Sequence, residues 1–241
     1  MISVCIATYN GEKYIKEQVD SIIKQLGPND EIIVSDDGST DGTIGILQRY
    51  KDDRMKIYHH ESSGANAFER VTNNFENALT HASGDYVFLS DQDDIWADDK
   101  VRLMVHELEG NLLVQCQLKP LGNVTADNSG WSIIPKKGLI PNLYKLPFFG
   151  CCMAMRKQML AVVLPFPKGI IAHDAWIGMV GIATKRYSFV DKQCQLYRFH
   201  GDNTSGTTGS RNPLWRKLYF RFCIFKGIVS RYKSIEEISI V

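Results

Sequence analysis

The stretch YVFLSDQDD, residues 86–94, decides how the rest of this sequence is interpreted. Its first half is short and apolar with aromatic residues, which is typical of a buried strand. Asp91, Asp93 and Asp94 follow directly. Such neighbouring carboxylates raise one another's pKa unless a cation compensates them, and a divalent cation is the usual clamp for a diphosphate. Ligands also bind at the carboxyl ends of parallel strands, which is where these residues would lie.

A second interpretation of the same four residues, 91–94, is a solvated loop. Its Asp side chains would then cap a helix that starts near Asp98. On these residues alone, neither interpretation is favoured.

The bulk properties describe an ordinary globular protein. The 241 residues are 44% hydrophobic and 23% charged, enough for one α/β domain. A net charge of +1 argues against a nucleic-acid partner. The six cysteines show no CxxC or Cys/His ligand spacing, so we expect reduced thiols in a cytoplasmic protein. No signal-peptide pattern is evident, and no run approaches the roughly 20 apolar residues of a membrane span.

The first half of the chain alternates between strand and helix patterns. We expect strands at residues 2–7, 32–34, 55–58 and 86–89, with helices at 12–25, 43–50 and around 68–79. Strands joined in this way by helices predict a parallel, doubly wound sheet. The strands lack polar alternation, as expected when both faces of a sheet are covered.

The second half is less regular. Residues 118–146 are rich in Gly, Pro, Asn and Lys and are predicted to be loop. Helices are expected at 156–164 and 174–184, and strands at 187–190 and 195–199. Without a clear linker, we favour one domain whose first half binds a nucleotide and whose second half shapes an acceptor site.

Polar turns follow the first two strands, as ATYNGE at residues 7–12 and SDDGSTDGT at 35–43. Tyr9 can stack on a base, and Asp36 or Asp37 can accept the imide N–H of uracil or thymine. Tight turns and helix caps at residues 39–41 are the alternative, but capping does not explain polar turns at three successive strand ends. Gly-rich phosphate loops and an EF-hand are absent, so diphosphate binding should run through a metal.

Together, ATYNGE, VSDDGSTDGT and GDYVFLSDQDDIW resemble the GT-A fold of glycosyltransferase family 2, closest to the bacterial rhamnosyltransferase-like branch. The resemblance runs over residues 2–100 and 149–206. It implies a Rossmann-like, doubly wound, mostly parallel sheet with an acceptor-side region after it. We therefore expect a GT-A domain at 1–206, divided into a nucleotide-sugar half (1–100) and an acceptor half (101–206), followed by a basic amphipathic tail at 207–241.

The same resemblance implies a donor site. Asp91 and Asp93 would be the DxD pair, with Asp93 the direct ligand of Mn²⁺ or Mg²⁺. Asp91 would contact the sugar or ribose, or serve as a second ligand, while Asp94 supports the loop. The residues expected to bind the nucleotide sugar are Thr8, Tyr9, Asn10, Glu12, Asp36, Asp37, Asn74, Asp91, Gln92 and Arg198.

Three later segments resemble the rest of such a site. Residues 149–153, FGCCM, resemble the loop where donor and acceptor approach each other. HDAW at 173–176 resembles a segment whose Asp is the catalytic base, which implies Asp174, although Ala175 replaces a Trp. YRFHGDN at 197–203 resembles a segment whose His completes the metal shell, which implies His200. Residues 112–140 fit the family poorly, with VQCQ at 114–117 where relatives have acidic residues.

These implications amount to a metal-dependent inverting glycosyltransferase. It would move a sugar from a UDP- or dTDP-linked donor to a hydroxyl of a growing surface polysaccharide or lipid-linked glycan. One alternative is a sugar-nucleotide pyrophosphorylase, although the Gly-rich N-terminal loop of those enzymes is absent. A non-catalytic sugar-nucleotide-binding protein is the other.

The tail adds a membrane hypothesis. Residues 211–233 contain seven Lys or Arg and no acidic residue, with aromatic residues interleaved at near-helical spacing. A helix of this kind is typical of an anionic membrane surface, here the inner face of the bacterial cell membrane. The alternative is a helix packed on the domain with a solvated basic face.

Overall fold

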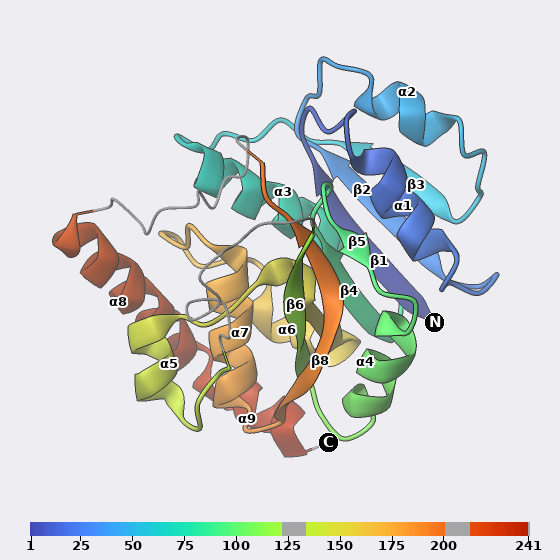
Figure 1. Ribbon diagram of the computed structural model, residues 1–241. Helices are drawn as coiled ribbons and strands as arrows, with labels where there is room; N and C mark the ends of the chain where they lie inside the picture. Colours follow the sequence, from blue (N-terminus) through green and yellow to red (C-terminus); the bar gives the residue numbers. More distant parts are fainter. Residues whose placement is uncertain (122–133, 201–212, 241) are drawn as a thin grey trace.

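The computed structural model describes residues 1–121, 134–200 and 213–240, and its strands form one mixed sheet (Figure 1). The strands are β1 (Ile2–Thr8), β2 (Glu31–Asp36), β3 (Met55–His59), β4 (Tyr86–Ser90), β5 (Ile95–Trp96), β6 (Leu113–Leu121), β7 (Met153–Arg156) and β8 (Tyr187–Arg198). Their order is β3-β2-β1-β4-β7-β6-β8-β5. The first four are mutually parallel, as predicted. β7 runs antiparallel to both β4 and β6, and β8 is parallel to β6.

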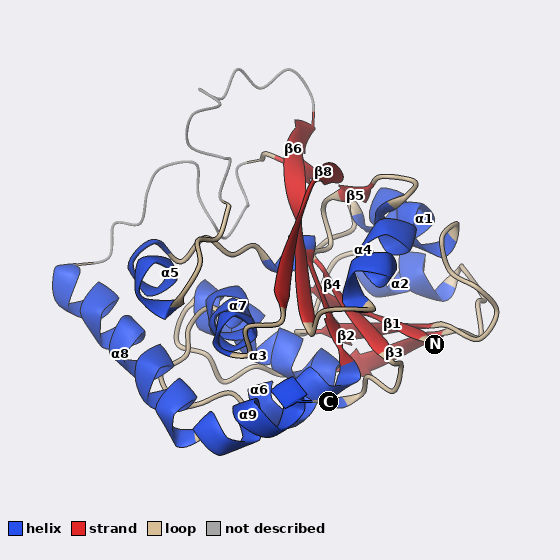
Figure 2. Ribbon diagram, turned by 90° about the horizontal axis from the view of Figure 1, so that it is seen from below, coloured by secondary structure: helices blue, strands red, loops and turns tan. Residues whose placement is uncertain are grey.

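Helices cover both faces of this sheet. They are α1 (Ile15–Ile23), α2 (Thr43–Gln48), α3 (Ala67–Thr80), α4 (Lys100–Leu108), α5 (Leu139–Lys145), α6 (Leu160–Val163), α7 (His173–Ala183), α8 (Leu214–Ser230) and α9 (Tyr232–Ile240). Figure 2 shows α1, α2 and α4 on one side of the strands and α3 with α5 to α9 on the other. β1 and β2 are almost entirely buried because both faces are covered, which explains their uninterrupted apolar sequence.

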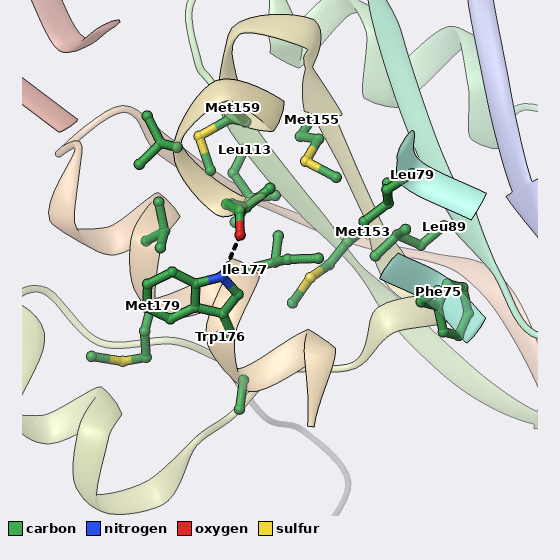
Figure 3. Close-up of a cluster of buried hydrophobic side chains, with 14 of the residues drawn as sticks. Phe75, Leu79, Leu89, Leu113, Met153, Met155, Met159, Trp176, Ile177 and Met179 are labelled. Atoms are coloured by element: carbon green, nitrogen blue, oxygen red, sulfur yellow. Dashed lines mark hydrogen bonds between the residues drawn. The ribbon is translucent and has the colours of Figure 1, made fainter. Parts of the chain in front are cut away.

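Two apolar cores lie on the two faces of the sheet. On the face covered by α1, α2 and α4, Val19 and Met104 pack against Val4 and Ile32. On the other face, Trp176 of α7 is fully buried among methionine and leucine side chains (Figure 3). Its indole Nε1 donates to the carbonyl oxygen of Val163 at 3.0 Å, so the one polar atom of this large side chain is satisfied. This bond ties α7, which carries Asp174, to α6.

The prediction of loop over residues 118–146 holds for the described residues 134–138 and 146 but is wrong for 118–121 and 139–145. β6 continues to Leu121, and α5 occupies Leu139–Lys145. Pro141 is the third residue of α5, where its missing N–H would have no helical partner in any case, so the helix tolerates it. Residues 122–133 lie outside the described part of the chain.

Two other predictions in the second half need correction. Residues 187–198 form one strand, β8, rather than two, because register shifts on either side of Gln117 accommodate residues 191–192 and 194. The helix predicted at 156–164 begins later: Arg156 ends β7 and pairs with Tyr86, a 3₁₀ turn follows over Lys157–Met159, and only then does α6 start.

The tail does pack on the domain. Phe220, Cys223 and Ile224 of α8 belong to the core around α7. The boundary expected at residue 206 falls within 201–212, outside the described residues. Among the helices that the structure describes, none has the length and apolar character needed to cross a membrane.

Candidate active site

The loops after β1 and β4 are held together by one side chain. The Gln92 amide accepts a hydrogen bond from the Tyr9 N–H and donates one to the Tyr9 carbonyl, both at 2.9 Å. Gly11 makes this approach possible, because a Cβ there would lie 2.3 Å from Oε1 of Gln92. Gln92 therefore holds the backbone of Tyr9 in place.

The loops after β1 and β2 are joined in a similar way. Oδ1 of Asn10 accepts from the Thr40 N–H at 2.8 Å, and Asn10 itself has a positive φ of 49°. Oε2 of Glu12 accepts from the Gly42 N–H at 2.7 Å. Asn10 and Glu12 were predicted to bind the nucleotide sugar. The structure shows them bonding the neighbouring loop, and their contact with a nucleotide sugar stays a prediction.

The two neighbouring aspartates after β2 have different surroundings. Asp36 is buried and accepts hydrogen bonds from Thr8 Oγ1 and the Ser39 N–H, each at 2.8 Å. Asp37 is partly exposed, and its Oδ1 accepts from the Ser62 N–H at 2.7 Å. Asp36 and Thr8 thus stabilise the loop, while Asp37 is the better placed of the two carboxylates to meet a ligand.

Beside them lies an aromatic platform. Tyr9 is 43% exposed, and the Arg70 guanidinium lies 5.3 Å from its ring centroid. Asn74 of α3 is buried and donates to the Thr8 carbonyl at 3.1 Å, while its Oδ1 has no hydrogen-bond partner. An exposed ring and an unpartnered amide oxygen are both suited to binding a nucleoside sugar.

The three aspartates after β4 are not helix caps. α4 begins only at Lys100, with no side-chain capping bond from Asp99. Asp94 is completely buried and accepts from Gln195 Nε2 at 2.8 Å and the Arg198 N–H at 2.9 Å. Burial and the neighbouring Asp93 charge raise the Asp94 pKa to about 7. Its bonds fit the predicted role of supporting the loop.

The charges of several other aspartates act on Asp91. Burial, followed by the charges of Asp93, Asp94 and Asp174, raises the Asp91 pKa well above its ordinary value. Asp174 comes from the start of α7, far along the chain from Asp91. Its charge acts on Asp91, and a shared site for the predicted base and the predicted DxD pair stays a prediction.

Asp93 and His200 also meet as predicted. His200 Nε2 lies 2.8 Å from Asp93 Oδ2, and its ring packs against Tyr14 at 4.8 Å between centroids. Arg198 was expected to face the diphosphate. Instead its Nε donates to the Asp93 carbonyl at 2.9 Å, and its guanidinium pairs with Glu17 and lies over the Tyr14 ring. Arg198 thus anchors the end of β8 to α1. Residues 201–203 of the YRFHGDN segment lie outside the described residues.

The base candidate sits on the first turn of α7. Asp174 Oδ1 accepts from the Ala175 N–H at 2.7 Å, and burial raises the Asp174 pKa to about 6. The preceding His173 is buried and stacks on Phe75 at 4.0 Å, with no hydrogen-bond partner on Nε2. Gly150 leaves room for that nitrogen, since a Cβ there would lie 2.4 Å from it. Burial lowers the His173 pKa to about 3, so its imidazole is neutral.

The carboxylates fit a divalent cation. Ligand atoms of Asp91, Asp94 and Cys151 all lie within 4.8 Å of one another. Asp94 already has its hydrogen-bond partners, and the Cys151 thiol pKa is raised, which keeps this soft ligand protonated. Hard cations prefer carboxylate oxygens, and Mn²⁺ also accepts imidazole. Within this group Asp91 is therefore the best-suited ligand, while Asp93 and His200, which bond each other, lie outside it.

Sequence reasoning missed Lys100. It is completely buried, and its Nζ donates to the Cys151 carbonyl at 2.6 Å and to Gln195 Oε1 at 2.5 Å. It also lies 4.2 Å from the Trp96 ring centroid. A Lys at the first position of a helix opposes the helix dipole, and this was the one local signal that it has another task. That task is to fix Gln195 and the Cys151 backbone beside the acidic cluster.

Comparison with known proteins agrees with this geometry. Residues 3–163 match the sequence profile of Glycosyl transferase family 2. The putative teichuronic acid biosynthesis glycosyltransferase TuaG of Bacillus subtilis is 42% identical over 42% of this chain and 39% of its own length. The dTDP-rhamnosyl transferase RfbG of Shigella flexneri is 28% identical over 88% and 78%, respectively. WfgD of Escherichia coli, a UDP-Glc:alpha-D-GlcNAc-diphosphoundecaprenol beta-1,3-glucosyltransferase, is 28% identical over 69% and 64%. The chain thus spans well under half of TuaG and just under two thirds of WfgD.

Solved structures share the fold. TarS of S. aureus in complex with UDP superimposes with a TM-score of 0.64 at 24% identity, over 82% of this chain and 60% of TarS. The mannosyltransferase PcManGT of Pyrobaculum calidifontis, in complex with GDP-Man and Mn²⁺, gives a TM-score of 0.64 at 20% identity, over 95% and 64%. The expected GT-A fold is therefore confirmed, with a mostly parallel sheet between two layers of helices. On the profile match over most of its length, this chain belongs to glycosyltransferase family 2.

Proposed function

We propose that this chain transfers a sugar from a UDP- or dTDP-linked donor to an acceptor hydroxyl, with inversion at the anomeric carbon. One observation carries this function: Asp93, after β4, and His200, after β8, meet at 2.8 Å at the end of the sheet where the other carboxylates follow β4. A base for the acceptor and a clamp for the donor diphosphate must lie at one site. Asp174 would be that base, and its charge contributes to the raised pKa of Asp91.

The donor would lie across the carboxyl ends of β1, β2 and β4. The uracil or thymine ring of the donor would stack on exposed Tyr9, with its imide N–H toward the free oxygen of Asp37. The unpartnered Oδ1 of Asn74 and the Asp91 carboxylate would accept from sugar or ribose hydroxyls. A ligand that satisfies a buried unpartnered oxygen gains a hydrogen bond that water does not supply there.

Asp91, Asp93 and His200 would hold Mn²⁺ or Mg²⁺, which when bound neutralises the negative charge of the departing nucleoside diphosphate. For this the Asp93–His200 hydrogen bond must open, and each partner would then contribute one ligand atom. The dependence on a metal is supported by the uncompensated charge around Asp91.

Asp174 would act as general base. It would take the proton from the acceptor hydroxyl as that oxygen attacks the anomeric carbon from the face opposite the diphosphate, whose bond to the sugar breaks. A pKa near 6 suits this task, because the carboxyl is ionised at neutral pH and still more basic than an ordinary aspartate. The neutral His173 next to it offers its unpartnered Nε2 to a substrate hydroxyl.

We further propose that residues 1–100 hold the nucleotide sugar, that 101–206 shape the acceptor site, and that the acceptor is a lipid-linked glycan or a growing surface polysaccharide. Support comes from two of the relatives. WfgD acts on an acceptor with a diphosphoundecaprenol group, and TuaG is assigned to teichuronic acid biosynthesis.

A thermal-shift screen tests the donor class. UDP- and dTDP-sugars should raise Tm in the presence of Mn²⁺ and much less in its absence, because a ligand that binds only the folded state stabilises it. Product analysis then tests the reaction, and we expect the free nucleoside diphosphate. Release of pyrophosphate would instead identify a pyrophosphorylase, and binding without any turnover would identify a non-catalytic binding protein.

A further inference from the structure

Helix α8 presents apolar side chains on two opposite faces. Phe220, Ile224 and Ile228 point into the core beside α7. On the far side lies an outer stripe, defined as Trp215, Leu218, Phe222, Phe225 and Val229, each between 54% and 67% exposed. These five residues alternate steps of three and four, which places them along one line of a helix. Five large exposed apolar residues in a line exceed the scattered exposure that is normal for a protein surface.

Basic residues flank the outer stripe. By the 3.6-residue period, Arg221 and Lys226 lie along the two edges of the stripe, while Arg216 and Lys217 lie further toward the inner face. No acidic residue occurs anywhere in α8. The second interpretation of the tail expected a solvated basic face after packing. The structure has the helix packed, but the face turned outward is apolar and only its edges are basic.

Helix α5 extends this surface. Ile140 and Tyr144 are 83% and 77% exposed, and Arg221 of α8 donates to the Tyr144 carbonyl at 2.7 Å. Figure 2 shows α8 along the outer edge of the molecule, on the side away from α1 and α2. The surface thus lies on the α3 side of the sheet, opposite the helices α1 and α2.

We propose that the outer stripe of α8, with Ile140 and Tyr144 of α5, docks on the interface of an anionic lipid bilayer. Apolar and aromatic side chains would enter the boundary between headgroups and acyl chains, while the flanking Lys and Arg reach lipid phosphates. A second copy of this chain fits less well, because pairing two such helices would bring basic edges together with no acidic partner on either.

Docking in this way would put the acceptor side of the molecule near the lipid. A cavity of about 350 Å³ lies between α8 and the first turn of α3, lined by Trp215, Tyr219, Phe68 and Ile171 among others. Ile171 is three residues before Asp174 in the chain. Only this link to a lipid-linked acceptor rests on the proposed function; membrane docking itself does not.

Cosedimentation with vesicles tests the inference. The full chain should pellet with phosphatidylglycerol–phosphatidylcholine vesicles at low salt, and weakly with pure phosphatidylcholine. The variant with Leu218→Ser, Phe222→Ser and Phe225→Ser should bind at least about tenfold less, because it loses most of the apolar area that would enter the lipid. Ile240→Ser is the matched control: Ile240 is 86% exposed but lies outside the stripe, and its loss should change little.

Three further readouts keep the result unambiguous. The variants should keep the wild-type circular dichroism and Tm, since the replaced side chains are exposed. Release of nucleoside diphosphate in the absence of lipid should be unchanged by the stripe variant, so failure of the reaction and failure of docking are separable. Absence of wild-type binding to anionic vesicles would overturn the inference, as would a wild-type dimer on size-exclusion chromatography that the stripe variant converts to monomer.

Discussion

The two walls of the site differ in how their polar groups are satisfied. On the wall built from the loops after β1 and β2, carboxylates and amides bond to one another: Asp36 to Thr8, and Glu12 to the Gly42 backbone. On the opposite wall, burial raises the pKa of both Asp91 and Asp174, and the charges of neighbouring aspartates add to the shift at Asp91. The first wall is a fixed frame, and the second holds unsatisfied charge. In this molecule, the chemistry is to be sought where the polar groups lack partners.

The largest effect that tests this difference is expected at Asp93. Asp93→Asn should lower turnover at least about a hundredfold, since losing a ligand of the charge-neutralising cation costs several kcal/mol in the transition state. The measurement is nucleoside diphosphate release against Mn²⁺ concentration. Ser188→Ala, far along β8 from Asp93, serves as the control and should leave the rate unchanged. A fully active Asp93→Asn variant would place the metal elsewhere.

The pH dependence of kcat/KM is the next test. Because burial raises the Asp174 pKa to about 6 and only the ionised carboxylate can take a proton, kcat/KM should fall about tenfold per pH unit on the acid side of that value. A cation bound near Asp91 would lower the Asp174 pKa, so the fall in kcat/KM would then begin at lower pH. A rate that is flat from pH 8 to well below pH 4, the ordinary range of an aspartate, would exclude a carboxylate base.

Stability should move in the opposite direction to activity at the same residue. The folded-state pKa of Asp174 lies above its unfolded value, so ionisation destabilises the folded state, and stability falls as pH rises from about 4 to about 6. Asp174→Asn removes this cost and should add about 1–2 kcal/mol to the free energy of unfolding at pH 8, allowing for partial exposure.

Urea unfolding of both proteins at pH 8 and below pH 4 measures this difference. No gain should be seen at the lower pH, where the wild-type carboxyl is protonated in both states. An Asn variant that is less stable at both pH values would mean that Asp174 has a structural role.

The smallest effect is expected on the fixed frame. Gln92→Met removes both hydrogen bonds to Tyr9 and should cost about 1 kcal/mol of stability. It should weaken nucleotide affinity more than turnover at saturating donor, since Tyr9 would lose its fixed position. Gln193→Met, at an exposed position of β8, is the matched control. Equal losses of stability and nucleotide affinity in the two variants would mean that the Gln92 hydrogen bonds do not fix Tyr9 for nucleotide binding.

The same difference explains how much the sequence could predict. The first wall was predictable because its loops each follow a strand within one motif, and the parallel register places Thr8 beside Asp36. Asp174 and His200 were found only through resemblance, since nothing local distinguishes Asp174 from a helix cap. Lys100, Cys151 and the hydrogen bonds of Arg198 depend on the pairing of β6, β7 and β8, which residue patterns did not indicate. The polar residues within β8 led to a prediction of two strands where the structure has one. The register shifts that accommodate them depend on the pairing with β6, which the local sequence does not show.

The tail makes a similar point. Its composition left a membrane surface and packing on the domain both open, and apolar residues on both faces of a helix do not show which of them turn inward. Only the structure separates the inner face of α8 from its outer stripe.

The most direct test of the central claim combines turnover and binding in Asp174→Asn. Nucleoside diphosphate release and Mn²⁺-dependent binding of the nucleoside diphosphate would be measured on the same preparation, beside the wild type. If Asp174 is the base that faces the donor clamp, release should fall about 10²–10⁴-fold while the Kd for nucleoside diphosphate stays within a few-fold. Normal turnover, or loss of binding together with turnover, would contradict the account.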